Sequence, residues 1–216
     1  MQTPAARADQ HDSWLWVAAT LVFAPFALKR LLELGEHGYV YWLAVDYGGH
    51  LVSLAGAFVA YRRGLLSPPR QSVGPLGSLV LTPVFLAVAL AQIGAWDPSV
   101  AKQLSVFTLS HYPHIGNASL KTIDLTLGLA LVAVSQEVAF RRILFDLLGR
   151  RISDRAIIVV MSSITFGLYH VTYGVDHFAV ASIYGLLFGT LYALTGRVWT
   201  CVAVHYVIDL RYFLSM

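Results

Sequence analysis

Long apolar runs recur along this chain, separated by short polar connectors. Seven such runs are present, each continuous and rich in Leu and Ala, without the alternation that is typical of a β-strand. They cover approximately residues 13–29, 39–61, 74–96, 122–145, 155–173, 177–195 and 198–215. Because roughly 20 apolar residues cross the hydrocarbon core of a bilayer as a helix, the sequence predicts an all-α fold, a polytopic transmembrane helical bundle with about seven spans.

The charge content also indicates a membrane protein. Of the 216 residues, 57% are hydrophobic and only 12% are charged, whereas soluble domains carry about 25% charged residues. Such a chain cannot cover a water-facing surface, so we expect the lipid bilayer to be part of its solvent. The polar N-terminal stretch lacks the basic region and the cleavage site of a secretory signal. The first apolar run is therefore interpreted as a retained span.

The basic residues predict an orientation and argue against nucleic-acid binding. The formal net charge is +3, but Lys and Arg stand in short clusters between apolar runs, where they meet lipid headgroups. The connectors after the second, fourth and sixth runs hold seven of them, and those after the first, third and fifth runs hold four. The positive-inside rule then predicts that the N-terminus lies in the cytoplasm. We expect no nucleic-acid partner.

Three of the C-terminal runs contain ionisable side chains, which cost roughly 2.5–3.5 kcal/mol each to insert into a membrane. Glu137 and Arg141 are four residues apart and share a helix face. His205 and Asp209 repeat that spacing in the last run, and His170 lies near the end of the fifth. Each feature alone has a structural explanation, such as an ion pair or an interfacial histidine. Together they bring polar groups of three helices to a common depth, which favours a functional site.

Three motifs in this half of the chain resemble those of the CAAX protease and bacteriocin-processing family of intramembrane glutamic endopeptidases. QEVAFRR resembles the EExxxR motif of that family, ITFGLYH resembles its FxxxH motif, and the region ending in HYVID resembles its HxxxN or HxxxD motif. The motifs occur in the family's order within about residues 135–212. The resemblance implies a catalytic core at 121–216, preceded at 1–120 by transmembrane helices without a signature, in one structural domain overall.

The resemblance implies a role for each matching residue. His170 is expected to help bind and activate the attacking water, and His205 and Asp209 are expected to form the oxyanion pocket. Glu137 stands at the second glutamate of EExxxR and Arg141 at its arginine, which implies a structural ion pair. Asp209 can donate a hydrogen bond to an oxyanion only when it is protonated, which a dry site favours.

The first motif departs from the family at Gln136, which occupies the position of the proposed general base. Glutamine cannot accept a proton from water at neutral pH, although it can orient a water molecule. Three explanations stay open. Glu137 takes over as the base, the protein is an inactive relative that binds or escorts substrates, or the substitution was introduced to trap the protein.

The expected activity is hydrolysis, by an activated water, of a peptide bond in a membrane-anchored or C-terminal-signal-bearing protein. The expected partners are a membrane-associated protein or peptide substrate and the lipid bilayer, and the expected location is the bacterial cytoplasmic membrane. We expect no cofactor. The alternative among enzymes is a metalloprotease that uses His170, His205 and a carboxylate as ligands. The alternative outside enzymes is an inactive binding or immunity protein of the same fold.

Other polar residues carry weaker signals. Asp46 and His50 lie four residues apart in the second run, which indicates a buried structural pair or a group for substrate binding or proton relay. His111 and His114 belong to a solvated loop or a small metal site. Cys201 is interpreted as a small buried residue.

Two further patterns concern packing and membrane depth. Gly185 and Gly189 form a GxxxG motif, which is typical of closely packed helices. The five tryptophans lie near the ends of runs, as in an interfacial aromatic belt; they are Trp14, Trp16, Trp42, Trp96 and Trp199.

Overall fold

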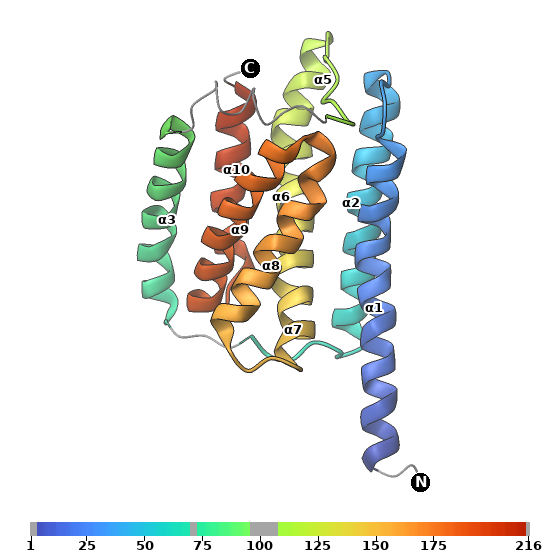
Figure 1. Cartoon of the computed structure of the whole chain (residues 1–216), viewed down its shortest axis with the longest axis vertical. Helices are drawn as coiled ribbons and strands as arrows, with labels where there is room; N and C mark the ends of the chain where they lie inside the picture. The colour runs from blue at the N-terminus through green and yellow to red at the C-terminus, as the bar shows by residue number, and fades with distance from the viewer. Residues whose placement is uncertain (1–3, 70–72, 96–107, 215–216) are drawn as a thin grey trace.

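The chain forms a bundle of long helices (Figure 1). This computed structural model describes residues 4–69, 73–95 and 108–214. Within these ranges the chain has helices and no β-strand, apart from one isolated bridge between Gly35 and Ser110. The predicted all-α fold is confirmed.

Each of the seven predicted runs contains helix. The elements are α1 (Pro4–Leu32), α2 (Tyr39–Arg62), α3 (Pro75–Ala95), α5 (Ala118–Ile123), η1 (Asp124–Gly128), α6 (Leu129–Glu137), η2 (Val138–Ile143), α7 (Leu144–Gly149), α8 (Arg155–His170), η3 (Val171–Tyr173), α9 (Val175–Thr195) and α10 (Val198–Leu214). The segments from α5 to α7 follow one another without a break and make one long helical rod. Among the described residues, five helical segments are long and apolar enough to cross a membrane: Tyr39–Arg62, Pro75–Gln92, Ala118–Gly149, Arg155–Tyr173 and Val175–Thr195.

The helices run up and down between two ends of the bundle, which we call the upper and lower ends as they appear in Figure 1. The upper end contains the turns at residues 33–38 and 171–174 and the segment 108–117. The lower end contains the turns at residues 63–69, 150–154 and 196–197. The N-terminal part of α1 extends below the other helices.

Local sequence signals determine where α8 starts and where α9 ends. The side chain of Asp154 accepts hydrogen bonds from the backbone N–H groups of Ala156 and Ile157, and so caps the start of α8. Gly196 ends α9 in the left-handed conformation, with φ of 63°, which is unfavourable for residues with a Cβ. The tight α9–α10 hairpin follows directly.

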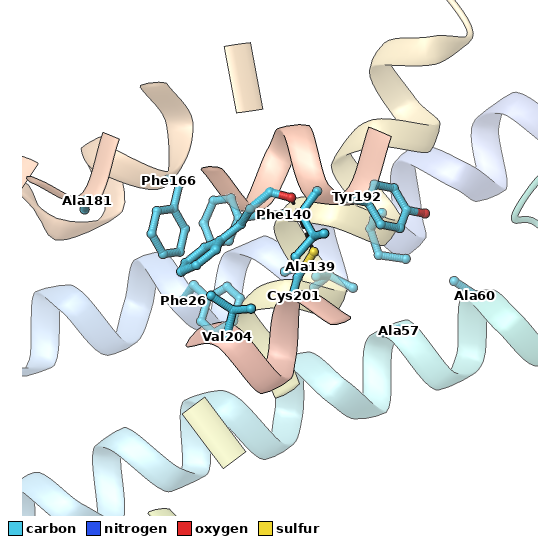
Figure 2. Packing of buried hydrophobic residues seen from close by; sticks show 14 of the residues in the cluster. Phe26, Ala57, Ala60, Ala139, Phe140, Phe166, Ala181, Tyr192, Cys201 and Val204 are labelled. Atoms are coloured by element: carbon cyan, nitrogen blue, oxygen red, sulfur yellow. Dashed lines mark hydrogen bonds between the residues drawn. The ribbon is translucent and has the colours of Figure 1, made fainter. Parts of the chain in front are cut away.

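Aromatic side chains fill the centre of the bundle (Figure 2). Phe140 stacks on Phe26 of α1 with ring centroids 6.1 Å apart, and meets the edge of Phe166 of α8 at 5.2 Å. These contacts join the N-terminal helices to the C-terminal ones. By contrast, only 11% of the α3 span is buried, and the helices with which α3 makes substantial contacts are α9 and α10. Its exposed apolar face is suited to lipid.

The tryptophan belt is present at the lower end, with one correction. Trp14, Trp16 and Trp199 are exposed there, and the guanidinium of Arg63 lies 5.6 Å from the Trp14 ring. The prediction is wrong for Trp42, which is buried against Tyr112 at a ring distance of 5.0 Å. Trp96 lies outside the described residues.

The predicted close packing at GxxxG is confirmed, and it yields a graded test. A Cβ added at Gly185 lies 2.9 Å from the backbone Cα of Ser163, whereas one added at Gly189 lies 3.2 Å from a side-chain methyl of Val159. Gly185→Ala is expected to destabilise the protein by about 1–3 kcal/mol, because backbone cannot move aside easily. Gly189→Ala is the control on the same helix, and thermal unfolding in detergent should show the smaller loss there. Equal losses would contradict this account.

Candidate active site

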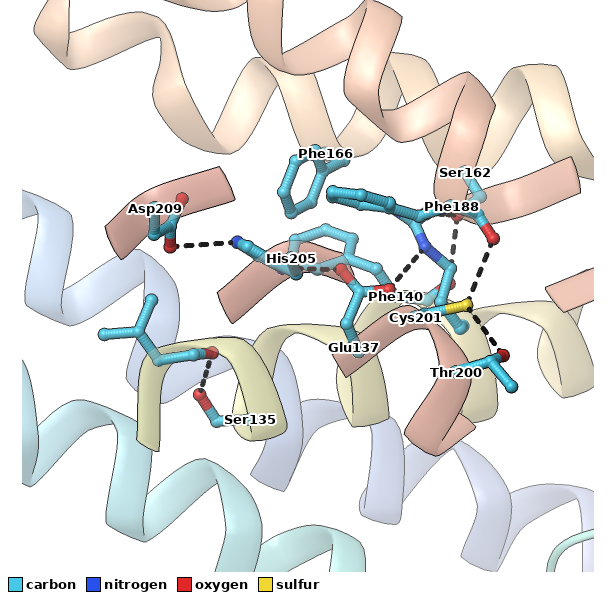
Figure 3. Close-up of polar contacts among 12 residues, drawn as sticks. Ser135, Glu137, Phe140, Ser162, Phe166, Phe188, Thr200, Cys201, His205 and Asp209 are labelled. Atoms are coloured by element: carbon cyan, nitrogen blue, oxygen red, sulfur yellow. Dashed lines mark hydrogen bonds and ion pairs between the residues drawn. The ribbon is translucent and has the colours of Figure 1, made fainter. Parts of the chain in front are cut away.

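Glu137 is the most buried carboxylate of the C-terminal half, and both of its oxygens have hydrogen-bond partners (Figure 3). Oε2 accepts a hydrogen bond from Nε of Arg141 at 2.9 Å, and Oε1 lies 2.8 Å from Nδ1 of His205. Arg141 is fully buried and donates from Nη1 to Oγ of Ser162 on α8 at 2.7 Å. The backbone here has a π-helical turn, η2, a feature that is frequent at functional sites.

His205 lies between two carboxylates. Its Nδ1 faces Glu137, and its Nε2 lies 3.2 Å from Oδ2 of Asp209, one turn further along α10. Phe188 stacks on the imidazole with centroids 5.0 Å apart and an interplanar angle of 19°. The ring is therefore held in orientation from both ends and from one face. The side chain of Asp209 is 24% exposed, while that of Glu137 is 0% exposed, so the site is open on the Asp209 side.

His170 is the last residue of α8 and is partly exposed. Its Nδ1 lies 2.8 Å from the backbone carbonyl of Phe166. A carbonyl only accepts hydrogen bonds, so this contact assigns the proton to Nδ1 and leaves the lone pair on Nε2. The Phe166 ring links the two histidines, at centroid distances of 4.7 Å from His170 and 5.8 Å from His205.

Gln136 is buried at 2% exposure, and its amide Oε1 has no hydrogen-bond partner among the described residues. The structure thus joins Glu137, Arg141, His205 and Asp209 in one chain of polar contacts and brings His170 next to it through Phe166. Gln136 makes no hydrogen bond to any of them in the described part of the chain. Its Oε1 is thus a buried hydrogen-bond acceptor without a partner in that part of the chain.

The other sequence-predicted residues are not part of this chain of contacts. His111 and His114 are exposed in the segment 108–117. No group of three His, Cys, Asp or Glu side chains that could hold a metal ion is found in residues 4–69, 73–95 and 108–214. Cys201 is fully buried, and its Sγ donates to the carbonyl of Phe188 at 3.3 Å, which agrees with its interpretation as a small core residue.

Comparison with known families supports this half of the chain as the functional one. Residues 118–211 match the family model named Rce1-like, which is described as type II CAAX prenyl endopeptidase Rce1-like. We refer to these residues as the Rce1-like region. The resemblance that the three motifs indicate is confirmed, and the family is one of CAAX-type proteases. No curated protein and no solved structure matches the chain.

A second buried polar cluster lies outside the Rce1-like region, and sequence reasoning missed it. The α1 charge cluster consists of Lys29, Arg30, Glu33 and Asp46, all less than 10% exposed. Lys29 Nζ lies 2.6 Å from Asp46 Oδ1 and 3.4 Å from Glu33 Oε1, and Arg30 Nη1 donates to Glu33 Oε2 at 2.8 Å. The assignment of Lys29 and Arg30 to a headgroup-facing connector is wrong. The signal was the spacing, because Glu33 follows the two cations by four and three residues.

The α1 charge cluster reaches the helix end that carries His170. Lys29 Nζ donates to the phenol oxygen of Tyr169 at 3.0 Å, and Arg30 Nη1 donates to that of Tyr173 at 2.6 Å. The Arg30 guanidinium also lies 4.0 Å from the centre of the Tyr169 ring. Since Tyr169 and Tyr173 flank His170 in sequence, the N-terminal helices fix the position of this end of the Rce1-like region.

Asp46 and His50 are both buried, at 3% and 0% exposure, as the structural interpretation of this pair predicts. Asp46 is closer to Lys29 than to His50, whose Nε2 lies 3.5 Å away. The other ring nitrogen of His50, Nδ1, lies 2.5 Å from Oγ of Ser135. The pair therefore ties α2 to α1 and to α6, immediately before Gln136.

A further contact fastens the segment 108–117 to the upper end. The Asp124 carboxylate accepts hydrogen bonds from the phenols of Tyr47, at 2.6 Å, and of Tyr112. Burial, together with the neighbouring Asp124 carboxylate, raises the pKa of the Tyr112 phenol. Tyr112 therefore stays protonated and keeps donating at physiological pH. Its ring also packs on Phe213 near the end of α10, with centroids 4.7 Å apart.

Proposed function

We propose that the protein is an intramembrane endopeptidase in which an activated water hydrolyses a peptide bond of a membrane-anchored protein or peptide. The observation that carries the proposal is the hydrogen bond from Nδ1 of His170 to the carbonyl of Phe166. It leaves the lone pair of Nε2 on a partly exposed histidine beside a buried imidazole–carboxylate chain. The Rce1-like match supports a protease, and the buried polar chain supports hydrolysis within the bundle.

The general base in this proposal is His170 rather than Glu137. Oε2 of Glu137 already accepts a hydrogen bond from Arg141 and Oε1 accepts one from Nδ1 of His205, and the side chain has no exposed surface. Taking a proton from water would disrupt these two contacts. His170 Nε2 requires no such rearrangement. Gln136 Oε1 has no partner among the described residues, and an amide oxygen of this kind can accept a hydrogen bond from water.

In the first step, the water oxygen bonds to the substrate carbonyl carbon, and one water proton moves to Nε2 of His170. The carbonyl oxygen becomes an oxyanion. Its hydrogen-bond donor is Nε2–H of His205, which lies 3.2 Å from Asp209 Oδ2 and donates to the carboxylate and the oxyanion together, or to the oxyanion alone. Glu137 holds the opposite nitrogen and so fixes the direction of that donor. In the second step, the C–N bond breaks and His170 returns the proton to the leaving amine.

The test uses the full chain, purified and reconstituted in liposomes with a library of membrane-tethered peptides. Cleavage fragments detected by mass spectrometry, still formed after extensive chelation, would support a water activated by protein side chains. Cleavage that is abolished by chelation and restored by zinc would support the metalloprotease alternative instead. No cleavage of any library member, in protein that remains folded, would support an inactive binding protein.

Placing the acidic residue of the family's motif at position 136 gives a separate prediction. Gln136→Glu is expected to raise kcat by at least about tenfold, because a positioned carboxylate contributes roughly 10²–10⁴ as a general base. The matched control is Gln92→Glu on α3, since Gln92 also has a buried Oε1 without a partner among the described residues. That variant should leave kcat unchanged. A drop in kcat for Gln136→Glu in folded protein would mean that the amide itself is required.

A further inference from the structure

The two ends of the bundle differ in exposed positive charge. Six arginines with exposed or half-buried side chains lie at or beside the turns of the lower end: Arg62, Arg63, Arg150, Arg151, Arg155 and Arg197. At the upper end, the described cations with exposed side chains are Lys121 and Arg211. Lys29 and Arg30 also belong to the upper half, but they are buried and face Glu33 and Asp46. Arg70 and Lys102 lie outside the described residues.

This distribution is more asymmetric than the sequence count of seven against four. Two of the four residues in that minority, Lys29 and Arg30, do not reach headgroups at all, because internal carboxylates neutralise them. Positive residues close to helix ends are retained on the cytoplasmic side. Exposed Trp14, Trp16 and Trp199 gather at the same lower end, as expected where helices leave the hydrocarbon core.

The site opens towards the opposite end. Along α10, which rises from the lower end to the upper end, the side chain of His205 is 5% exposed and that of Asp209, one turn higher, is 24% exposed. His170 is the last residue of α8, directly before the upper turn at 171–174. The exposed fraction of the site's side chains therefore increases from buried Glu137 towards the upper end, away from the arginines of the lower end.

We infer that the site is entered from the non-cytoplasmic face, and that its substrate is an extracytoplasmic segment next to the membrane anchor of a polypeptide. The part that concerns the substrate rests on the proposed endopeptidase function. A segment on the cytoplasmic face would have to pass the arginine-bearing lower end and the packed aromatic core around Phe140 to reach His170. A segment on the outer face meets Asp209 and His170 first.

The orientation can be tested without any activity. The chain has a single cysteine, Cys201, which is fully buried, so Cys201→Ala gives a background without thiols. Ser119 on α5 and Ser153 in the lower turn are both exposed serines, and Ser119→Cys and Ser153→Cys form a matched pair. In intact bacterial cells, a membrane-impermeant maleimide should label Ser119→Cys and should label Ser153→Cys only after permeabilisation. The reverse pattern would overturn the inference.

A second arm tests the side of cleavage. Two single-span reporters carry the same randomised segment beside the span, one outside and one inside the cytoplasmic membrane. Cleavage of the outer segment, lost in His170→Ala, would support the inference. Cleavage of the inner segment alone would overturn it while leaving the endopeptidase function intact. Cleavage of neither would count against the endopeptidase function and so against an outer substrate, while the labelling pattern still decides which face the site opens on.

Discussion

Replacing His170 with alanine is expected to lower kcat by roughly 10²–10⁴, the usual contribution of a positioned general base, while the helical bundle stays folded. The reason is the way in which the ring is held. Its Nδ1 bonds only to the carbonyl of Phe166 on its own helix, at 2.8 Å. Its loss therefore removes a proton acceptor and leaves no buried charge without a partner. The measurement is kcat and KM for a tethered peptide that the wild type cleaves, with thermal unfolding in parallel.

The choice of control decides how informative this variant is. His177 lies near the start of α9, close to the same upper turn, and its side chain is 41% exposed, so His177→Ala should keep full activity. His205→Ala is less informative, because it also removes a partner of the buried Glu137 carboxylate. If His170→Ala kept wild-type kcat while remaining folded, the base would lie elsewhere, and the exposed side of Asp209 would be the next group to test.

The positions of the helices follow closely from the sequence. Apolar runs predict where most helices lie to within a few residues, since burial in lipid leaves helix as the way to satisfy the backbone. The exception is α1, which begins at Pro4, nine residues before the predicted run at 13–29. The tight hairpin at Gly196 and the start of α8 after Asp154 reflect local chemistry that operates within one turn. The same locality makes the ion pair of Glu137 with Arg141 predictable from its spacing alone.

Contacts between distant parts of the chain were not predictable in this way. Nothing in the sequence near Lys29 indicates that Asp46, from another helix, lies 2.6 Å away. A pair of cations at the end of an apolar run has the same pattern whether it faces headgroups or a buried carboxylate. The link between Glu137 and His205 spans 68 residues, and no local spacing predicts it. It is this contact that occupies Glu137 and shifts the proposed base to His170.

The buried charges also link the two halves of the chain. The α1 charge cluster places Lys29 and Arg30 against Tyr169 and Tyr173, so the N-terminal helices position the end of α8. A buried, hydrogen-bonded ion pair contributes little net stability, but it is costly to break. Such pairs add little stability to the native fold, but they exclude arrangements of the helices in which the charges would be buried without partners.

Because a buried ion pair is costly to break, we expect the loss of the contact between Glu137 and Arg141 to reduce stability the most. Glu137→Gln leaves a fully buried guanidinium without its carboxylate, and Arg141→Met leaves the carboxylate without its main cation. Each variant is expected to lose about 3–5 kcal/mol of unfolding free energy. The double variant should lose clearly less than the sum, because it leaves neither charge unpaired.

The control pair lies on the same helical rod at the same spacing. Arg142 and Asp146 are 3.8 Å apart, with side chains 19% and 5% exposed. Asp146 also has Arg150 3.3 Å away, so removing Arg142 does not leave this carboxylate without a cation. Replacing Arg142 should therefore cost clearly less than breaking the pair of Glu137 and Arg141. Reversible unfolding in mixed detergent micelles, carried through both double-mutant cycles, measures the two coupling energies. Equal coupling energies for the two pairs would mean that the loss of a single buried partner does not determine the cost.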